Sequence, residues 1–230
     1  MKTLVDLMQH SFRLYGRRNR IFLPSLRSRI DFLNLAVGDL QEALRKEAGN
    51  LALRASLARV VSRIFCIAEH FLDLPLAEMV ARKYLADHCA YCLTLPCSCP
   101  ERRSEAHLQE TPPVEVAPSL RKICTLLERV YGARNREKGL EYILNRLFKE
   151  ASELISLSMK RWDAHTRIED IEKEFGLELA DALAWTIAVA NFVAVDLEAA
   201  FLERYGNGCG KCRGNPCTCI GFSFEPLRWI

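Results

Sequence analysis

Glycine and proline are scarce in this chain, and most of them gather in a few short segments. The 230 residues include 11 glycines and 9 prolines, whereas 50% of the residues are hydrophobic. This composition excludes a wholly disordered chain, because enough apolar surface is available to bury a core. The runs of Leu, Ala, Glu, Arg and Lys between these segments favour helix. We therefore expect an all-α protein.

Long apolar runs are also missing. The N-terminus has no apolar stretch of the length that a secretion signal needs, and no segment approaches the ~18 consecutive apolar residues of a membrane span. The most apolar stretch, residues 179–195, is interrupted by Asp181 and Asn191. We expect no membrane partner and a cytoplasmic location, where clustered cysteines indicate metal sites rather than disulfides.

A strong net charge is the third absence. The formal charge is +3 with all thiols neutral. Two cysteine clusters that each bound Zn²⁺ as four thiolates would lower it to about −1. No basic patch can be argued from composition, so a nucleic-acid partner is not expected.

Helical periodicity divides the first half into four segments, residues 3–16, 28–47, 51–74 and 74–88. A cysteine cluster follows at residues 89–99, and a polar segment with prolines at 100–117 is typical of a linker. The second half repeats this order with offsets between about 111 and 121 residues, up to a second cysteine cluster of identical spacing. We interpret the chain as a duplication, with repeats at 1–99 and 118–230, in which two helical bundles form an intrachain pseudo-dimer.

Four acids in the second half are the candidate site. Glu150 and Glu153, like Glu178 and Asp181, are spaced i, i+3, so each pair lies on one helix face. Two such helices packed together would bring four carboxylates to one place, where a cation must neutralise them. Hard oxygen ligands suit Mg²⁺ or Mn²⁺. Asp181 is the sharpest candidate, because its helix is almost wholly apolar and a charge there needs a partner.

The first half retains only part of this set. Asp39 and Glu42 correspond to the first acid pair, but Leu57 and Val60 stand where Glu178 and Asp181 stand in the second half. We expect one active site per chain, with a degenerate first repeat.

The two acid pairs, separated by 24 residues and followed by Asn191 and the segment Asp196-Leu197-Glu198, resemble the MazG-like all-α nucleotide pyrophosphohydrolases. The likeness covers about residues 119–205. It implies a helical bundle, often oligomeric, that hydrolyses nucleoside triphosphates to a monophosphate and pyrophosphate with Mg²⁺. Further homo-oligomerisation is therefore also expected. The resemblance makes the four acids catalytic Mg²⁺ ligands or water activators. Lys149 departs from the family pattern, which often has an acid there.

Cationic and aromatic residues near the ends of the acid helices are candidates for substrate binding. Phosphate contacts could come from Lys149, Lys160, Arg161 and Arg204, the last suggested by the resemblance together with Asn207. Trp162 could stack on a base. The alternative for these side chains is a solvated surface or, for Trp162, packing at a helix end.

The pattern C-x₂-C-x₄-C-x-C occurs twice and predicts two structural Zn²⁺ sites, since four thiolates within eleven residues can close one tetrahedral site. The ligands would be Cys89, Cys92, Cys97 and Cys99 in the first cluster, and Cys209, Cys212, Cys217 and Cys219 in the second. An Fe–S centre, a redox C-x₂-C pair and a nucleic-acid-binding knuckle are the alternatives, and His88 could replace a thiolate. We expect Cys66 and Cys124 to be core residues.

The function that we predict is Mg²⁺-dependent pyrophosphohydrolysis of nucleoside triphosphates. The alternative is a non-catalytic zinc-binding regulatory or assembly protein derived from such an enzyme.

Overall fold

The computed structural model describes residues 2–71, 76–99, 106–108, 118–160 and 168–220. Within these ranges the chain forms seven helices and no strand, which confirms the expected all-α fold. The first four are α1 (Leu4–Phe22), α2 (Leu26–Arg45), α3 (Asn50–Ala68) and α4 (Leu76–Tyr84). The others are α5 (Leu120–Lys160), α6 (Ile168–Phe192) and α7 (Leu197–Tyr205). Most of the segment predicted as a linker lies outside the described residues.

Side-chain caps fix several helix starts. The Thr3 hydroxyl accepts a hydrogen bond from the Asp6 N–H while the Asp6 carboxylate accepts one from the Thr3 N–H, a capping box that begins α1. At α2 and α7 a single bond does this, since the Ser25 hydroxyl accepts from the Ser28 N–H and the Asp196 carboxylate from the Ala199 N–H. These short polar side chains satisfy N–H groups that have no partner within the helix.

The long helix α5 has a sharp break at Gly139, whose φ is +82° and ψ 169°. A positive φ is readily adopted only by glycine. The break divides α5 into a first segment, residues 120–138, and a second segment, residues 140–160. Only the second segment carries Glu150 and Glu153.

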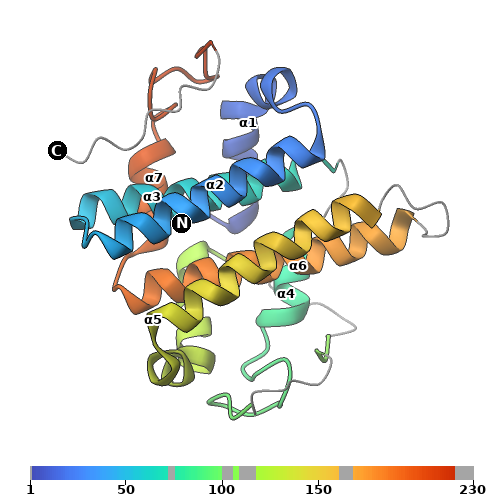
Figure 1. The fold of residues 1–230 in the computed structure, drawn as a ribbon, viewed down its shortest axis with the longest axis vertical. Coiled ribbons are helices and arrows are strands. Elements are labelled where there is room, and N and C mark those ends of the chain that lie inside the picture. Colours follow the sequence, from blue (N-terminus) through green and yellow to red (C-terminus); the bar gives the residue numbers. More distant parts are fainter. Residues whose placement is uncertain (1, 72–75, 100–105, 109–117, 161–167, 221–230) are drawn as a thin grey trace.

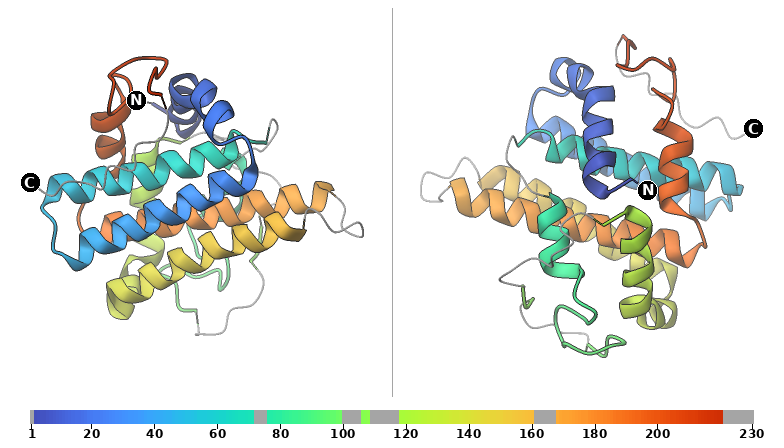
Figure 2. Two further views of the ribbon diagram at one scale, coloured as in Figure 1. Left: turned by 45° about the horizontal axis from the view of Figure 1, so that its top comes forward. Right: turned by 180° about the vertical axis from the view of Figure 1, so that it is seen from behind.

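Two helical hairpins form the centre of the molecule. Helix α2 packs along α3, and α5 packs along α6; the hairpins then meet through contacts of α2 with α5 and of α3 with α6. Figure 1 shows the two hairpins crossing the molecule one above the other, and Figure 2 shows the same layering from two further sides. The fully buried Leu33, Leu57 and Leu179 belong to the single apolar core that these helices enclose.

The two short helices cross between the hairpins. Helix α4 follows α3 in sequence but packs against α6, and α7 follows α6 but packs against α3 (Figure 2). Each therefore brings the cysteine cluster that follows it to the opposite half of the chain. The Cys97 N–H donates to the Val130 carbonyl on α5 at 2.8 Å, and the Cys217 N–H donates to the Leu14 carbonyl on α1 at 2.8 Å.

Helix α6 is long and apolar enough to cross a membrane by length and composition, over Ile171–Phe192. Of its most apolar window, 72% is buried inside the bundle. The apolarity of α6, which came closest to a span in the sequence, is thus explained by its position in the core.

Candidate metal sites and the adjoining pocket

Three of the four predicted acids converge between α5 and α6. Glu150 projects from the second segment of α5, and Glu178 and Asp181 project from α6. One carboxylate oxygen of each lies within 4.8 Å of those of the other two. The i, i+3 spacing on α6 places its two acids on the face that meets α5, as the sequence predicted.

Basic and hydroxyl groups that were not predicted from the sequence surround these acids. The Lys83 ammonium lies 2.6 Å from an Asp181 oxygen, and the Tyr84 hydroxyl donates a hydrogen bond of 2.6 Å to the same oxygen. Both residues belong to α4, which follows the first hairpin in sequence but packs on α6 of the second hairpin. Arg146, one turn before Glu150, donates to its carboxylate at 3.0 Å.

The carboxyl groups are costly to ionise without a further cation. Burial raises the pKa of Glu150 to about 9 and also raises the pKa of Glu178, and the nearby Asp181 charge acts in the same direction on both. Glu178 Oε2 is buried and accepts no hydrogen bond from the described residues. A buried carboxylate oxygen without a donor is a position that a cation would satisfy.

Glu153 occupies the rim of the site instead of its centre. Its side chain is 38% exposed and forms an ion pair with Lys149. Although burial acts in the opposite direction, hydrogen bonding with Glu150 and Lys149 lowers the pKa of Glu153. Glu153 is therefore an ionised acid that water can reach.

The other residues predicted to bind substrate are dispersed. Lys160 is exposed at the C-terminal end of α5. Arg204 lies on α7, which packs against α3, and its Nε donates to the Tyr205 hydroxyl at 3.2 Å. Arg161 and Trp162 lie outside the described residues. The exposed Asn207 lies in the turn that follows α7.

An aromatic pocket adjoins the acids. Trp185, one helical turn after Asp181, lines it with Tyr84, Tyr91 and Tyr131. The other lining residues are Leu127, Arg134, Asn135, Ala184, Ala188 and Asn191. Its free space, about 30 Å³, holds roughly two waters as the side chains stand. The i, i+4 spacing of Trp185 from Asp181 is the signal by which the sequence could have identified this tryptophan, in place of Trp162, as the aromatic neighbour of the acids.

Two guanidinium groups lie over the Trp185 ring. Arg146 Cζ is 5.4 Å and Arg134 Cζ is 5.8 Å from the ring centroid. Arg134 also lies over Tyr131, at 5.4 Å. The pocket thus combines flat aromatic faces with cationic groups, and Arg146 links it directly to Glu150.

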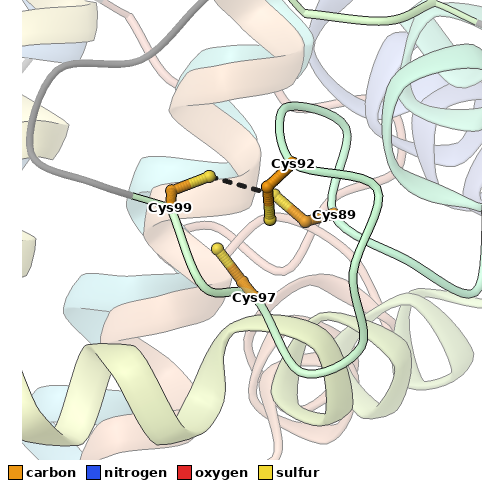
Figure 3. Close-up of side chains that lie close together, drawn as sticks. All are labelled: Cys89, Cys92, Cys97 and Cys99. Carbon is orange, nitrogen blue, oxygen red and sulfur yellow. Dashed lines mark hydrogen bonds between the residues drawn. The ribbon is translucent and has the colours of Figure 1, made fainter.

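Each cysteine cluster gathers its four sulfur atoms within 4.8 Å of one another. In the first cluster Cys89 Sγ and Cys99 Sγ are 3.5 Å apart (Figure 3), and in the second Cys209 Sγ lies 3.4 Å from Cys217 Sγ and 3.9 Å from Cys219 Sγ. Four thiolates on one Zn²⁺ lie about 3.8 Å apart, from Zn–S bonds of about 2.3 Å. The distances fit a tetrahedral metal site and exceed the ~2.05 Å of a disulfide.

Backbone and hydroxyl donors point at the sulfur atoms. The N–H groups of Tyr91 and Lys211 donate to Cys89 Sγ and Cys209 Sγ, both at 3.4 Å. Although burial opposes it, hydrogen bonds from Thr94 lower the pKa of Cys92 to about 5. A lowered pKa means that a thiolate, the form that binds metal, is already favoured at the exposed edge of the cluster. Four cysteines complete the first cluster without a ligand from His88.

The remaining cysteines fit the interpretation as core residues, Cys66 fully and Cys124 in part. Cys66 is buried and Cys124 is half-buried, and burial raises the pKa of the two thiols to about 11 and about 12. Neither belongs to a metal-ligand group among the described residues. Raised pKa values keep both thiols protonated and unreactive.

The acids left in the first half are already paired. Asp39 forms an ion pair with Arg59 of α3, and Glu42 forms one with Lys46 at 2.6 Å. Leu57 and Val60 are fully buried in the core. Asp39 is therefore paired with Arg59, whereas its counterpart Glu150 lies beside Glu178 and Asp181.

The chain matches no protein-family model, no curated protein and no solved structure.

Proposed function

We propose that the chain is a Mg²⁺-dependent pyrophosphohydrolase of nucleoside triphosphates, which it cleaves to a monophosphate and pyrophosphate. The observation that supports this most is the convergence of Glu150, Glu178 and Asp181 beside an aromatic pocket. The resemblance of the acid pattern to the MazG-like pyrophosphohydrolases supplies the reaction. The donor set fits Mg²⁺, because all three ligands are carboxylates and Glu178 Oε2 has no hydrogen-bond partner in the part of the chain that the structure describes.

The acids and the side chains around them would have different roles in such a reaction. Mg²⁺ held by Glu150, Glu178 and Asp181 would supply charge neutralisation for the phosphates. Arg146 and Lys83, each bound to one of these acids, are placed to contact phosphate oxygens. Glu153, ionised and reached by solvent, can accept a proton from the attacking water. Trp185 and Tyr131 offer faces on which a nucleobase can stack.

The two halves form an intrachain pseudo-dimer in this proposal, and paired contacts support a duplication. The hydrogen bond from Cys97 N to Val130 O corresponds, with offsets of 120 and 116 residues, to that from Cys217 N to Leu14 O. The bond from Ala90 N to Tyr131 Oη likewise corresponds to that from Gly210 N to Tyr15 Oη. Random similarity between helical segments would not reproduce contacts in register.

The pseudo-dimer has one composite site. Lys83, Tyr84 and Tyr91 come from the first repeat, and the acids and Trp185 come from the second. The first repeat lacks counterparts of Glu178 and Asp181 but contributes a wall and a cation to the site of its partner. The two cysteine clusters hold structural Zn²⁺ in this proposal.

A non-catalytic zinc-binding protein is the second candidate, and Lys83 is the observation that favours it. Its ammonium is buried against Asp181 and already balances part of the negative charge. In that case the acids would be structural and would need no Mg²⁺. The two proposals differ in whether Mg²⁺ stabilises the protein and whether nucleotides are turned over.

Turnover of the eight common nucleoside and deoxynucleoside triphosphates with Mg²⁺ tests the proposal. We expect equimolar monophosphate and pyrophosphate from at least one of them. Asp181→Asn and Glu178→Gln should each lower kcat/KM by about 10³-fold or more, because the metal ligands act as a unit. Glu174→Gln, an exposed acid on the same helix, is the matched control and should change it less than twofold. Absence of pyrophosphate from every substrate would exclude the enzyme.

A further inference from the structure

The first cysteine cluster forms part of the aromatic pocket. Tyr91 lies between the ligands Cys89 and Cys92, and its side chain lines the pocket together with Tyr84 and Trp185. Lys83 Nζ lies 5.8 Å from the centroid of the Tyr91 ring, so this residue also faces the cation of the acid site. The position of Tyr91 therefore depends on how the cluster holds the backbone between its first two cysteines.

Three further contacts connect this cluster to the first segment of α5. The Cys97 N–H donates to the Val130 carbonyl at 2.8 Å, and the Ala90 N–H donates to the Tyr131 hydroxyl at 3.2 Å. Arg134 Nη1 lies 3.6 Å from Cys97 Sγ. Tyr131 and Arg134, less than one helical turn apart, line the pocket themselves. The cluster thus contacts one pocket wall through a backbone bond, a hydroxyl and a sulfur atom.

Arg134 carries the connection across the pocket. Its guanidinium contacts Cys97 Sγ on one side and lies over the rings of Tyr131 and Trp185 on the other. A Cys₄ site that holds a divalent metal has a net charge of about −2, which attracts the guanidinium. Metal binding by the cluster and the position of the Arg134 guanidinium over Trp185 are therefore linked by direct contacts.

The second cluster has the same backbone contacts but a different surrounding. The Gly210 N–H donates to the Tyr15 hydroxyl at 3.4 Å, as Ala90 does to Tyr131. Lys211 replaces the tyrosine between the first two cysteines. Phe65, which corresponds to Trp185 with an offset of 120, is fully buried against Phe201. A buried pair of phenylalanines therefore lies where Trp185 lies on the other side.

We propose that metal binding by the first cysteine cluster controls the ligand-binding shape of the aromatic pocket, whereas the second cluster only stabilises the fold. This inference rests on the proposed function in naming the ligand, a nucleoside triphosphate, and adds a regulation to that site. Loss of metal from Cys89, Cys92, Cys97 and Cys99 releases Tyr91, Tyr131 and Arg134 from their positions. The affinity of the pocket then follows the metal content of the first cluster.

The test compares Cys92→Ala with Cys212→Ala in the full-length protein. Both change the second ligand of a cluster, and neither side chain is fully buried. Zinc content should fall from two to one per chain in each. Affinity for the α,β-imido analogues of dCTP and dATP should fall about tenfold or more in Cys92→Ala and less than twofold in Cys212→Ala. Equal effects of the two variants on affinity would overturn the proposal.

Acrylamide quenching of Trp185, in a background with Trp162→Phe and Trp229→Phe, gives a readout that needs no nucleotide. We expect Cys92→Ala to change the quenching constant at least twofold and Cys212→Ala to leave it unchanged. No response of Trp185 to Cys92→Ala would refute the coupling even if the nucleotide binds. Absence of nucleotide binding by wild type, with Trp185 responding, would refute the proposed function and leave the coupling.

Tyr131→Phe tests the coupling without replacing a metal ligand. It keeps the aromatic ring and removes the hydroxyl, which accepts the Ala90 N–H bond and also interacts with Cys89, so affinity should fall about threefold to tenfold. Tyr15→Phe removes the corresponding bond at the second cluster and should have less than a twofold effect. In the Cys92→Ala background the effect of Tyr131→Phe should disappear, because the bond is already broken. Full additivity of the two substitutions would contradict the proposal.

Discussion

Lys83 and Asp181 form a buried ion pair at the centre of the candidate site. Their side chains are 8% and 10% exposed, and the Tyr84 hydroxyl supports the carboxylate. Although burial opposes its charge, the Asp181 carboxylate raises the pKa of Lys83. Lys83 and Arg146 supply two positive charges beside three acids, so negative charge remains for Mg²⁺ to balance when all three are ionised in the proposed function.

Replacing Lys83 by Met should destabilise the metal-free protein by about 2–4 kcal/mol, because Asp181 then remains buried with a weaker partner. Addition of Mg²⁺ should recover more stability in Lys83→Met than in wild type. Urea unfolding with EDTA or with Mg²⁺ measures both. Asp181→Asn in the same chain should remove most of the cost, and a double substitution as unstable as Lys83→Met would show that lost packing, not charge, is responsible.

Glu150 should make the stability of the metal-free protein depend on pH. Its folded pKa, about 9, lies above its unfolded value, so the folded state binds the extra proton. Stability should therefore be highest below pH ~4.5, as far as this group is concerned, and fall as pH rises towards 9. The loss between pH 5 and pH 7 should be on the order of 2 kcal/mol.

Glu150→Gln should flatten that pH dependence, since the amide does not titrate. Urea unfolding in EDTA at several pH values provides the measurement, and Glu174→Gln provides a control that should keep the wild-type slope. Mg²⁺ should reverse the trend in wild type, because the ionised carboxylates bind it. If Glu150→Gln leaves the slope of stability against pH unchanged, the extra proton of the folded state is bound by another group.

The break at Gly139 divides α5 into two helical segments. The sequence predicted helix on both sides of this residue, through the match to two separate helices of the first half, and the backbone angle shows where the turn lies. It permits the first segment of α5 to pack beside the first cysteine cluster while the second segment packs along α6.

Gly139→Ala should destabilise the protein by about 1–2 kcal/mol, since a Cβ is strained at a φ of +82° even though the space around it is open. Gly38→Ala is the matched control. Gly38 lies inside α2 with a helical backbone and open space, so alanine should stabilise by about 0.5–1 kcal/mol. Thermal unfolding of both variants checks the opposite signs.

Local patterns predicted the helices and the cysteine clusters well, because periodicity and short spacings act within one element. Glu178 and Asp181 were found since i, i+3 spacing fixes a shared face. Lys83 and Tyr91 were missed because their place depends on which helix α4 packs against. No residue pattern within α4 indicates that it crosses to the opposite hairpin.

Crossing of α4 and α7 makes the whole molecule one interlocked unit. Each short helix covers a central helix of the other half, and each cysteine cluster bonds to the first helix of the other half. Both short helices pack mainly on the other half of the chain, although α7 also contacts α5 of its own half. We therefore expect each half to leave part of its apolar surface uncovered when it is alone.

Fragments 1–107 and 118–230 should therefore fail to fold separately and assemble when mixed. Circular dichroism during urea titration should show no cooperative transition for either fragment, and one for the equimolar mixture with Zn²⁺. Cooperative unfolding of an isolated fragment with full helix content would contradict the interlocked arrangement.

In the proposed function each chain has one carboxylate metal site, made by α5 and α6. Titration with Mn²⁺, followed by electron paramagnetic resonance, counts this site directly in the zinc-loaded protein. We expect one tightly bound Mn²⁺ per chain, retained in Glu174→Gln and lost in Glu178→Gln. Binding that is absent in wild type, or that persists unchanged in Glu178→Gln, would contradict the account.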